Sequence, residues 1–294
     1  MAEKISKISI ITNFNIDEKA KAAKRVCEFL SDYPCSIYLG EQAKQRLYLF
    51  EEIRDKISFA APAVLYHEVD LIIVLGGDGS ILSAVRNIGG SNIPILGINL
   101  GRLGYMAELE MNDIEQLSKI FTGEYFLDER AKLEVSVMRQ GRNLSNRTTA
   151  LNDAVLSNGF IARMIDLELS EGENIITEYR ADGLIFATPT GSTAYSMSAG
   201  GPVIDPRVRC ICVTPICPHS LTAKPLLFSD DATLTVKNIC NREKMLFLTL
   251  DGKINYEIYR GDTVTIKKSA STAKLMRFNK CGFYKTLHSK MSVN

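Results

Sequence analysis

The chain has 294 residues, of which 46% are hydrophobic and 23% charged, and its formal net charge is +1. This length allows two domains of ordinary size, and the composition is that of a soluble globular protein. The near-neutral charge argues against a broad nucleic-acid or membrane surface, so we expect neither partner. No apolar run approaches the ~20 residues that span a bilayer, and the N-terminus does not resemble a signal peptide, so we expect a cytoplasmic protein.

The first 125 residues show alternating strand and helix patterns. Apolar runs predict strands at 7–11, 71–75 and 92–98, and helical spacing of apolar residues predicts helices at 17–30, 41–59, 80–86 and 113–121. Strands that alternate with helices indicate a parallel sheet with right-handed crossovers. We therefore predict a Rossmann-like α/β domain over residues 1–125.

A glycine-rich loop follows the most apolar of these strands. Residues 69–79 read Val-Asp-Leu-Ile-Ile-Val-Leu-Gly-Gly-Asp-Gly, and Ile81, Leu82 and Val85 then follow at helical spacing. Glycines at a strand-to-helix turn let backbone N–H groups approach a phosphate, and the helix N-terminus adds a partial positive charge. A carboxylate would repel phosphate there, so we predict that Asp78 takes a proton from an attacking hydroxyl or helps to hold a metal ion. The alternative is a tight turn in which Asp78 only caps the helix.

A second glycine loop, at residues 99–105, follows the strand predicted at 92–98. The carboxyl ends of parallel strands meet at one edge of a sheet, so we expect the ligand crevice at that edge. Residues 77–82 read G-x-G-x-x-L, which lacks the third glycine of the dinucleotide fingerprint, and no Gly-Lys-Ser/Thr follows as in a Walker A loop. Neither of these two phosphate-binding motifs is therefore present.

The pattern changes from residue 126 onward. Apolar and polar residues alternate at 133–137, 165–169, 234–236, 246–250 and 264–266. Short alternating runs separated by Gly, Asn and Asp turns predict an antiparallel, all-β domain over residues 126–278, with a short helix at 193–199. Residues 279–294 form a tail with a helical pattern at 282–291, and we expect this tail to pack back on the N-terminal domain.

Residues 180–202 carry a dense group of hydroxyl side chains around Gly191. Such hydroxyls can hydrogen-bond ribose, amide and phosphate groups, although one of Ser192 and Thr193 is expected to cap a helix. The nucleophile motif G-x-S-x-G is absent and the chain has three histidines, so a serine hydrolase is not favoured. Asp182 is a candidate acceptor for an amide or a ribose hydroxyl, and Arg180 either faces phosphate or pairs with Asp182.

Seven cysteines are scattered along the chain, an odd count that does not suggest a disulfide framework. Cys210, Cys212 and Cys217, with His219 after them, raise the alternative of a metal site. The alternating residues 209–214 instead favour a strand in which Cys210 and Cys212 are small buried apolar residues.

These segments together resemble the NAD kinase family, whose members phosphorylate the 2′-hydroxyl of the adenosine ribose of NAD. The resemblance covers nearly the whole chain, in the family's order and at its approximate spacing, at 76–79, 97–105, 152–153, 180–183, 188–198, 215–221, 224–226 and 251–253. The Gly-Gly-Asp-Gly loop also resembles that of diacylglycerol kinases and phosphofructokinases. The Gly-Ser-Thr-Ala-Tyr segment at 191–195 is what points to a dinucleotide.

The resemblance implies a mechanism and a set of site residues. Asp78 corresponds to the general base, ATP is the phosphoryl donor together with a divalent ion that we expect to be Mg²⁺, and NAD is the acceptor. Asn152 and Asp153 match an Asn-Glu pair that holds the adenosine ribose, and Asp182 with residues 193–198 matches the part that binds the nicotinamide side and the adenine. The implied site residues are Asp78, Gly79, Tyr105, Asn152, Asp153, Arg163, Arg180, Asp182, Thr193, Ala194, Tyr195, Ser196, Met197, Ser198 and Lys253.

The sequence departs from the family pattern at several of these positions. Asp153 is one methylene shorter than the usual Glu, Tyr105 replaces the usual Phe, and Lys253 stands where many relatives have Gln. Arg163 matches a basic or polar residue near the dinucleotide, whereas Ser83 stands where several relatives carry a basic residue. The shorter Asp153 side chain requires its contacts with the ribose hydroxyls to shift.

Two other functions share parts of this pattern. A diacylglycerol-type lipid kinase would share the Gly-Gly-Asp-Gly loop, but it would need a deep apolar pocket and a basic membrane-facing patch. A non-catalytic nucleotide-binding module would leave Asp78 without a role beside phosphate. The family resemblance also implies a homo-oligomer, either a dimer or a tetramer.

Overall fold

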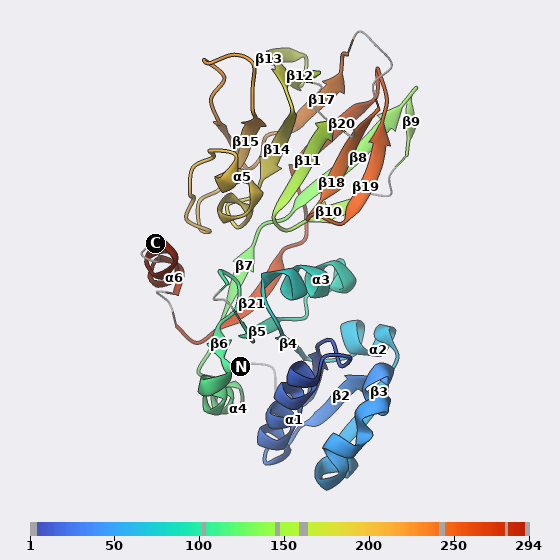
Figure 1. Cartoon of the computed structure of the whole chain (residues 1–294), viewed down its shortest axis with the longest axis vertical. Helices are drawn as coiled ribbons and strands as arrows, with labels where there is room; N and C mark the ends of the chain where they lie inside the picture. The colour runs from blue at the N-terminus through green and yellow to red at the C-terminus, as the bar shows by residue number, and fades with distance from the viewer. Residues whose placement is uncertain are drawn as a thin grey trace. The chain divides into compact units, whose positions relative to one another are not determined.

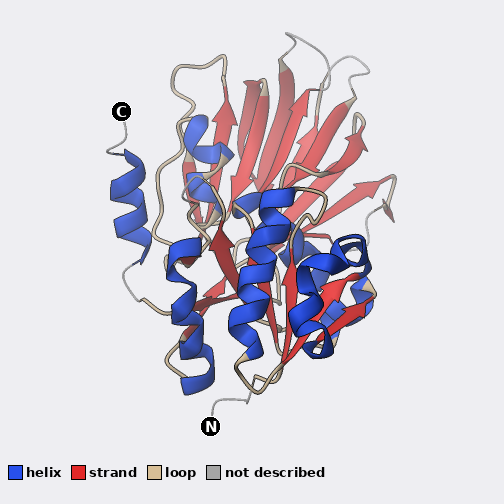
Figure 2. Cartoon of the chain, turned by 60° about the horizontal axis from the view of Figure 1, so that its bottom comes forward, coloured by secondary structure: helices blue, strands red, loops and turns tan. Residues whose placement is uncertain are grey.

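The computed structural model describes residues 5–101, 104–144, 148–158, 164–240, 245–279 and 282–291. The chain divides into two compact units, Met1–Glu129 with Ala273–Asn294 (unit 1) and Arg130–Thr272 (unit 2). Helices are concentrated in unit 1, and unit 2 is built almost entirely of strands (Figures 1 and 2). The predicted combination of an α/β unit and an all-β unit is therefore confirmed.

Unit 1 is a sheet with helices on its faces. Its strands are β1 (Lys7–Ile11), β2 (Ser36–Gly40), β3 (Ile57–Ala60), β4 (Leu71–Leu75), β5 (Ile95–Asn99), β6 (Leu109–Glu110), β7 (Phe126–Arg130) and β21 (Ala273–Arg277). Its helices, with η for 3₁₀-helix, are α1 (Asp17–Ser31), η1 (Glu41–Lys56), α2 (Pro62–His67), α3 (Asp78–Ile88), η2 (Met111–Leu117), α4 (Ser118–Thr122) and α6 (Gly282–Met291). None of the helices in the described residues is long and apolar enough to cross a membrane.

The strand order of this sheet is β3-β2-β1-β4-β5-β21-β7, with β6 paired to β5, and strands β1 to β5 pair in parallel. Every residue of the central strand β4 is buried. Leu71, Ile73 and Leu75 belong to the core cluster that includes α1, and the alternate residues Ile72 and Val74 face the opposite side, where α3 contacts β4. The unbroken apolar run therefore reflects burial on both faces, as the sequence predicted.

Three local predictions in unit 1 need correction. The helix predicted over 41–59 is a kinked 3₁₀-helix that ends at Lys56, and residues 57–60 are strand β3, paired in parallel with β2. This short edge strand has no strong local pattern, and its pairing with β2 decides its conformation. The helix predicted at 113–121 is two shorter pieces, η2 and α4, and the strand predicted at 92–98 begins only at Ile95.

Unit 2 consists of two antiparallel sheets. The first has the order β10-β8-β20-β17-β12-β13, with β9 paired to β8, and the second has the order β16-β15-β14-β11-β18-β19. The strands are β8 (Leu133–Arg139), β9 (Arg142–Asn143), β10 (Thr148–Ala150), β11 (Asp153–Asn158), β12 (Ile165–Glu171), β13 (Asn174–Ala181), β14 (Gly183–Ala187), β15 (Cys210–Ile216), β16 (Leu226–Ser229), β17 (Leu234–Asn238), β18 (Leu246–Leu250), β19 (Ile254–Ile258) and β20 (Thr263–Lys268). The two short helices are η3 (Gly191–Thr193) and α5 (Tyr195–Ser198).

The inner faces of the two sheets share one hydrophobic core. The alternating apolar residues that predicted strands all lie in it, including Val135, Leu167 and Val236 from the first sheet and Leu248 from the second. The other face of the second sheet packs against residues 199–204, so β14 is also buried on both sides. The helix predicted at 193–199 is interrupted, because Ala194 between η3 and α5 has non-helical backbone angles.

The chain passes between the units twice, after Glu129 and after Thr272. β7 precedes the first passage and β21 follows the second, and the two strands are hydrogen-bonded neighbours in the sheet of unit 1 (Figure 1). Residues 126–129 and 273–278, which the sequence pattern groups with the β domain, therefore lie in unit 1, where β7 and β21 join its sheet. Helix α6 covers the predicted range 282–291 and also belongs to unit 1.

Candidate active site

The Gly-Gly-Asp-Gly loop joins β4 to α3 at the carboxyl edge of the parallel sheet. A Cβ atom on Gly76 would lie 2.4 Å from Ser80 Oγ, so the loop closes tightly onto the first turn of α3. The sheet extends from β1 to β2 and β3 on one side and from β4 to β5 on the other, so the strand order reverses between β1 and β4. Open α/β sheets bind ligands at this kind of switch point, and the glycine loop lies directly there.

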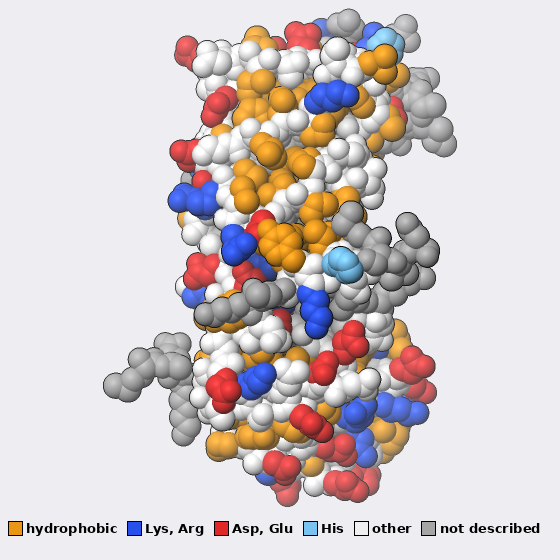
Figure 3. Space-filling view, turned by 90° about the vertical axis from the view of Figure 1, so that its left-hand side faces the viewer, with side chains coloured by type: hydrophobic (Ala, Val, Ile, Leu, Met, Phe, Trp, Pro, Cys, Tyr) orange, Lys and Arg blue, Asp and Glu red, His pale blue; other side chains and the backbone are white. Residues whose placement is uncertain are grey.

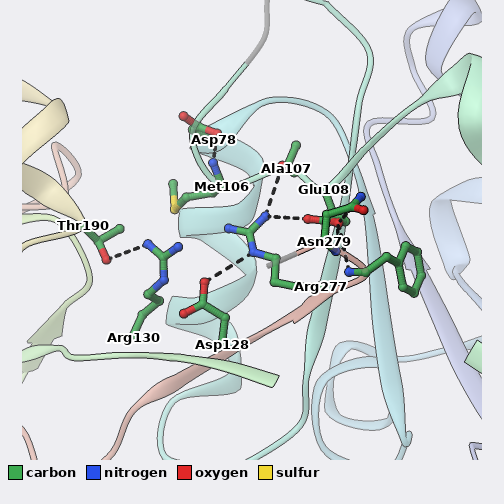
Figure 4. A network of polar contacts seen from close by, with 10 residues as sticks. Asp78, Met106, Ala107, Glu108, Asp128, Arg130, Thr190, Arg277 and Asn279 are labelled. Atoms are coloured by element: carbon green, nitrogen blue, oxygen red, sulfur yellow. Dashed lines mark hydrogen bonds and ion pairs between the residues drawn. The ribbon is translucent and has the colours of Figure 1, made fainter. Parts of the chain in front are cut away.

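The Asp78 carboxylate is fixed by the second glycine loop. Its Oδ2 accepts a hydrogen bond from Tyr105 N at 2.9 Å. Its Oδ1 accepts one from Met106 N at 3.1 Å (Figure 4). A Cβ atom on Gly104 would lie only 2.0 Å from Asp78 Oδ1, so only glycine allows this close approach. Burial raises the pKa of the Tyr105 phenol, and the negative charge of Asp78 raises it further. The structure thus places Asp78 and Tyr105, two of the predicted site residues, in direct contact, next to the exposed Gly79.

Asn152 and Asp153 lie at the start of β11 in unit 2, and the segment is fixed by Asp251. The Asp251 carboxylate accepts hydrogen bonds from the backbone N–H groups of Leu151, Asn152 and Asp153 at 3.0, 2.8 and 3.2 Å. The side-chain oxygen Oδ1 of Asn152 is buried and has no hydrogen-bond partner among the described residues. An orphaned buried acceptor costs stability unless a ligand or water satisfies it, so this oxygen indicates a binding position.

Burial, together with the negative charge of the neighbouring Asp251, raises the pKa of the Asp153 carboxyl to about 7. The unfolded chain loses this proton near the ordinary value of 3.8, whereas the folded protein keeps it up to about 7. Between these pH values the folded state binds more protons than the unfolded state, so the stability contributed by Asp153 falls as the pH rises and is lost above about pH 7.

Asp153→Asn is therefore expected to stabilise unit 2 at pH 8, by ~2–4 kcal/mol, and to have little effect at pH 4. Urea unfolding followed by circular dichroism across this pH range measures the difference. The exposed Asp231 provides the control, since Asp231→Asn should show no pH-dependent gain. An equal effect of Asp153→Asn at pH 4 and pH 8 would contradict the raised pKa.

The hydroxyl-rich segment packs directly on Asn152. A Cβ atom on Gly191 would lie 2.0 Å from Asn152 O, and Thr188 Oγ1 donates to Leu151 O at 2.6 Å while accepting from Gly191 N at 3.0 Å. Several hydroxyls serve this fold internally: Ser192 Oγ bonds Pro189 O and Ile204 N, and Ser196 Oγ bonds Thr214 Oγ1 at 2.9 Å. Tyr195, Met197 and Ser198 are exposed, whereas Ser196 is fully buried.

Arg180 and Asp182 lie elsewhere in unit 2. Asp182 precedes β14 and Thr188 follows it, so six residues of extended chain, about 20 Å, separate Asp182 from the Asn152 segment. The Nε atom of the exposed Arg180 side chain lies 3.9 Å from Asp166 Oδ1, so among the described residues its ion-pair partner is Asp166 and not the Asp182 of one predicted alternative. Lys253 is exposed two residues after Asp251, and Arg163 lies outside the described residues.

The sequence did not reveal how three further residues shape these segments. Asp251 holds the 151–153 backbone, Gly104 admits the Asp78 carboxylate, and Gly191 admits the Asn152 carbonyl. The Asp-Gly turn directly after the apolar run 246–250 was the available signal for Asp251.

Cys210 and Cys212 are buried residues of a strand, as predicted, and belong to no group of the described residues that could hold a metal ion. Cys210 and Cys212 are buried in β15, and Cys217 is exposed beyond it. Among the described residues, no group of three or more His, Cys, Asp and Glu side chains could hold a metal ion.

A parallel nucleotide-binding sheet with a Gly-Gly-Asp-Gly loop, joined to a β-sandwich with a buried free acceptor, defines the chain as a two-domain kinase. Family models match both parts: the ATP-NAD kinase N-terminal domain over residues 8–125 and the ATP-NAD kinase C-terminal domain over residues 151–278. The chain belongs to the ATP-NAD kinase family, and the resemblance found in the sequence is confirmed.

Individual NAD kinases are similar to this chain in sequence and in structure. The chain is 41% identical over 273 residues to the NAD kinase of Symbiobacterium thermophilum, covering 89% of this chain and 96% of that protein. It is 38% identical to the NAD kinase of Syntrophotalea carbinolica, with 98% of each chain covered. Among solved structures, the NAD kinase of Archaeoglobus fulgidus in complex with ATP is 25% identical with a TM-score of 0.73, covering 98% of this chain and 99% of that one. Yeast NADH kinase complexed with NADH shares the fold, with a TM-score of 0.91 at 24% identity, covering 100% of this chain and 89% of that one.

Proposed function

We propose that this chain transfers the γ-phosphoryl group of ATP to the 2′-hydroxyl of the adenosine ribose of NAD, giving NADP and ADP. The bond from the γ-phosphorus to the β–γ bridging oxygen breaks, a bond to the ribose oxygen forms, and the hydroxyl proton passes to the Asp78 carboxylate. One observation carries this proposal. The Asp78 carboxylate lies in the glycine loop at the N-terminus of α3 and accepts hydrogen bonds from two backbone N–H groups, those of Tyr105 and Met106. A loop that only bound phosphate would have no use for that negative charge.

We propose that the Asn152 segment holds the acceptor ribose. The buried Oδ1 of Asn152, which has no partner in the described part of the chain, supports this role, because a ribose hydroxyl would supply a donor. Asp153 follows in the same rigid segment, and its carboxyl is a second partner for the ribose. The further nucleotide contacts that we propose are Gly79, Tyr105, Arg163, Arg180, Asp182, Thr193, Ala194, Tyr195, Ser196, Met197, Ser198 and Lys253.

We propose that Mg²⁺ enters this site on the phosphates of ATP. The described residues offer no cluster of carboxylates, cysteines and histidines that could form a protein metal cage. Mg²⁺ commonly binds through one or two carboxylates together with substrate phosphates, so the phosphates of ATP would supply most of its ligands here. When bound, the ion neutralises charge on the transferring phosphoryl group.

We also propose that the protein is a homo-oligomer, a dimer or a tetramer. The resemblance to the NAD kinase family implies an oligomer, and exposed hydrophobic side chains in unit 2 offer a surface for a second copy. Hydrophobic side chains gather on the upper part of one face (Figure 3), and exposed ones in unit 2 include Val208, Leu221 and Leu227. Light scattering at several concentrations measures the oligomeric state, and a monomer at all of them would contradict the proposal.

The cytoplasm is the proposed location. The six described cysteines, Cys27, Cys35, Cys210, Cys212, Cys217 and Cys240, are all free thiols. Free thiols fit a reducing compartment, where disulfides are rare. Fractionation of the producing cells tests this location.

The test of function compares acceptors in one assay. The purified protein with ATP and Mg²⁺ is expected to convert NAD to NADP, which a NADP-specific dehydrogenase detects, and to leave diacylglycerol unchanged. Arms with NADH as acceptor and polyphosphate as donor define the specificity. Phosphatidate formation would indicate the lipid kinase instead, and nucleotide binding without any product would indicate a binding module.

A further inference from the structure

A buried ionic cluster adjoins the segment that holds Asp78, since Ala107 and Glu108 directly follow Met106 in the chain (Figure 4). Its centre is Arg277 at the end of β21, whose side chain is 9% exposed. Arg277 Nη1 lies 3.3 Å from Glu108 Oε2 and donates to Ala107 O at 3.2 Å, while Arg277 Nε lies 3.4 Å from Asp128 Oδ2. The cluster therefore joins the 107–108 backbone to both β7 and β21.

Glu108 makes the most contacts to the C-terminal segment. Its Oε1 accepts hydrogen bonds from Phe278 N at 2.9 Å and Asn279 N at 3.0 Å, and its side chain is 5% exposed. Its own N–H donates to Gly97 O in β5 at 2.9 Å. A buried carboxylate with this many donors is fixed in both position and orientation.

The residues bonded to Asp78 and the residues bonded to Arg277 are consecutive in the chain. Tyr105 and Met106 donate their N–H groups to Asp78, and the next two residues, Ala107 and Glu108, are the ones bonded to Arg277. Four residues of backbone thus connect the carboxylate of Asp78 to the ionic cluster. A shift of 107–108 would move the two N–H groups that orient Asp78, and small displacements of a reacting group are costly in phosphoryl transfer.

We propose that Glu108 is a positioning residue for Asp78. Through its pairing with Arg277 and the backbone beyond β21, it holds the 105–106 backbone so that the Asp78 carboxylate faces the acceptor hydroxyl. This inference rests on the proposed role of Asp78 as the general base. Glu108 would thus affect the rate of phosphoryl transfer through Asp78, without contacting a substrate itself.

Glu108→Gln tests this role while keeping the size of the side chain. The amide oxygen can still accept the backbone N–H groups, but the amide NH₂ faces the Arg277 guanidinium, donor against donor. We expect kcat to fall about tenfold or more, with the KM values for ATP and NAD changed by less than about twofold. Steady-state kinetics on protein shown to be folded by circular dichroism measures this split.

Asp262 in unit 2 provides a matched control. It is also a buried carboxylate, 3% exposed, which pairs with Arg139 at 2.7 Å and accepts a backbone N–H from Tyr259 at 2.8 Å. Asp262→Asn breaks an equivalent cluster far along the chain from the Asp78 loop. We expect it to lower the unfolding temperature and to leave kcat within about twofold of the wild type.

A double mutant separates positioning from general weakening. If Glu108 acts through Asp78, Asp78→Asn combined with Glu108→Gln should be no slower than Asp78→Asn alone. Additive losses would overturn the proposal, as would an unchanged kcat in Glu108→Gln or a loss that appears only in KM. Where Glu108→Gln does not fold, Arg277→Lys, which keeps the charge but not the three contacts, is judged by the same criteria. If the single variant Asp78→Asn keeps its turnover, Asp78 is not the base and the positioning role of Glu108 fails with it. If Glu108→Gln keeps its turnover while Asp78→Asn loses it, the positioning role fails and the role of Asp78 as the base stands.

Discussion

Asp78→Asn is expected to lower kcat by about 10³-fold or more, while ATP and NAD still bind. The change removes the carboxylate that we propose accepts the proton of the attacking ribose hydroxyl. It also removes a charge close to the phosphates, so ATP should bind at least as tightly as in the wild type. NADP formation in the coupled assay gives kcat, and isothermal titration calorimetry gives the two affinities.

Asp70 is the control for this experiment. It lies just before β4, whereas Asp78 lies just after it, and its carboxylate likewise accepts two backbone N–H groups, from Ser6 at 2.8 Å and Lys7 at 2.9 Å. Asp70→Asn should therefore disturb a similar set of hydrogen bonds at the opposite edge of the sheet without lowering kcat. Turnover by Asp78→Asn close to that of Asp70→Asn would show that Asp78 is not the base.

The parts of the fold that the sequence predicts are those determined by local pattern and burial. β4 is a continuous apolar run because both of its faces are covered, and the strands of unit 2 alternate because only one side of each sheet faces the shared core. The sequence does not predict β3, because its four residues form a strand through their pairing with β2. β21 is recognisable as a strand, but nothing local indicates that it joins the sheet of the other unit.

The residues of the candidate site likewise fall into those that the sequence predicts and those that only the structure reveals. Asp78 is conspicuous because a carboxylate inside a glycine loop needs a chemical reason. Asp251 is not, because its role depends on backbone groups about one hundred residues earlier in the chain. Glu108 is equally hidden, since its partners come from the C-terminal segment 170 residues away. Here the proposed base carries a recognisable sequence pattern, whereas Asp251 and Glu108, which hold backbone segments in place, are found only by their contacts.

Gly191 is the position where a single methyl group is expected to do most damage to the NAD site. In Gly191→Ala the new Cβ would lie 2.0 Å from the carbonyl oxygen of Asn152 and 2.4 Å from its carbonyl carbon. These are backbone atoms, and neither side can yield easily, because Asn152 O accepts from Thr188 N while Asn152 N is held by Asp251. Overpacking of this kind costs ~1–3 kcal/mol or more, so we expect the Kd for NAD to rise about 10- to 100-fold.

The affinity for ATP distinguishes this local effect from general damage. Gly191 is in unit 2 and the glycine loop is in unit 1, so the Kd for ATP should change by less than about twofold in Gly191→Ala. Gly90 gives the control substitution, because a Cβ atom there meets no atom within 4 Å and its φ is not positive. Gly90→Ala should leave both affinities unchanged. Wild-type NAD affinity in a folded Gly191→Ala protein would mean that the contact between residues 191 and 152 does not shape the ribose site, and the position assigned to Asn152 would have to be abandoned.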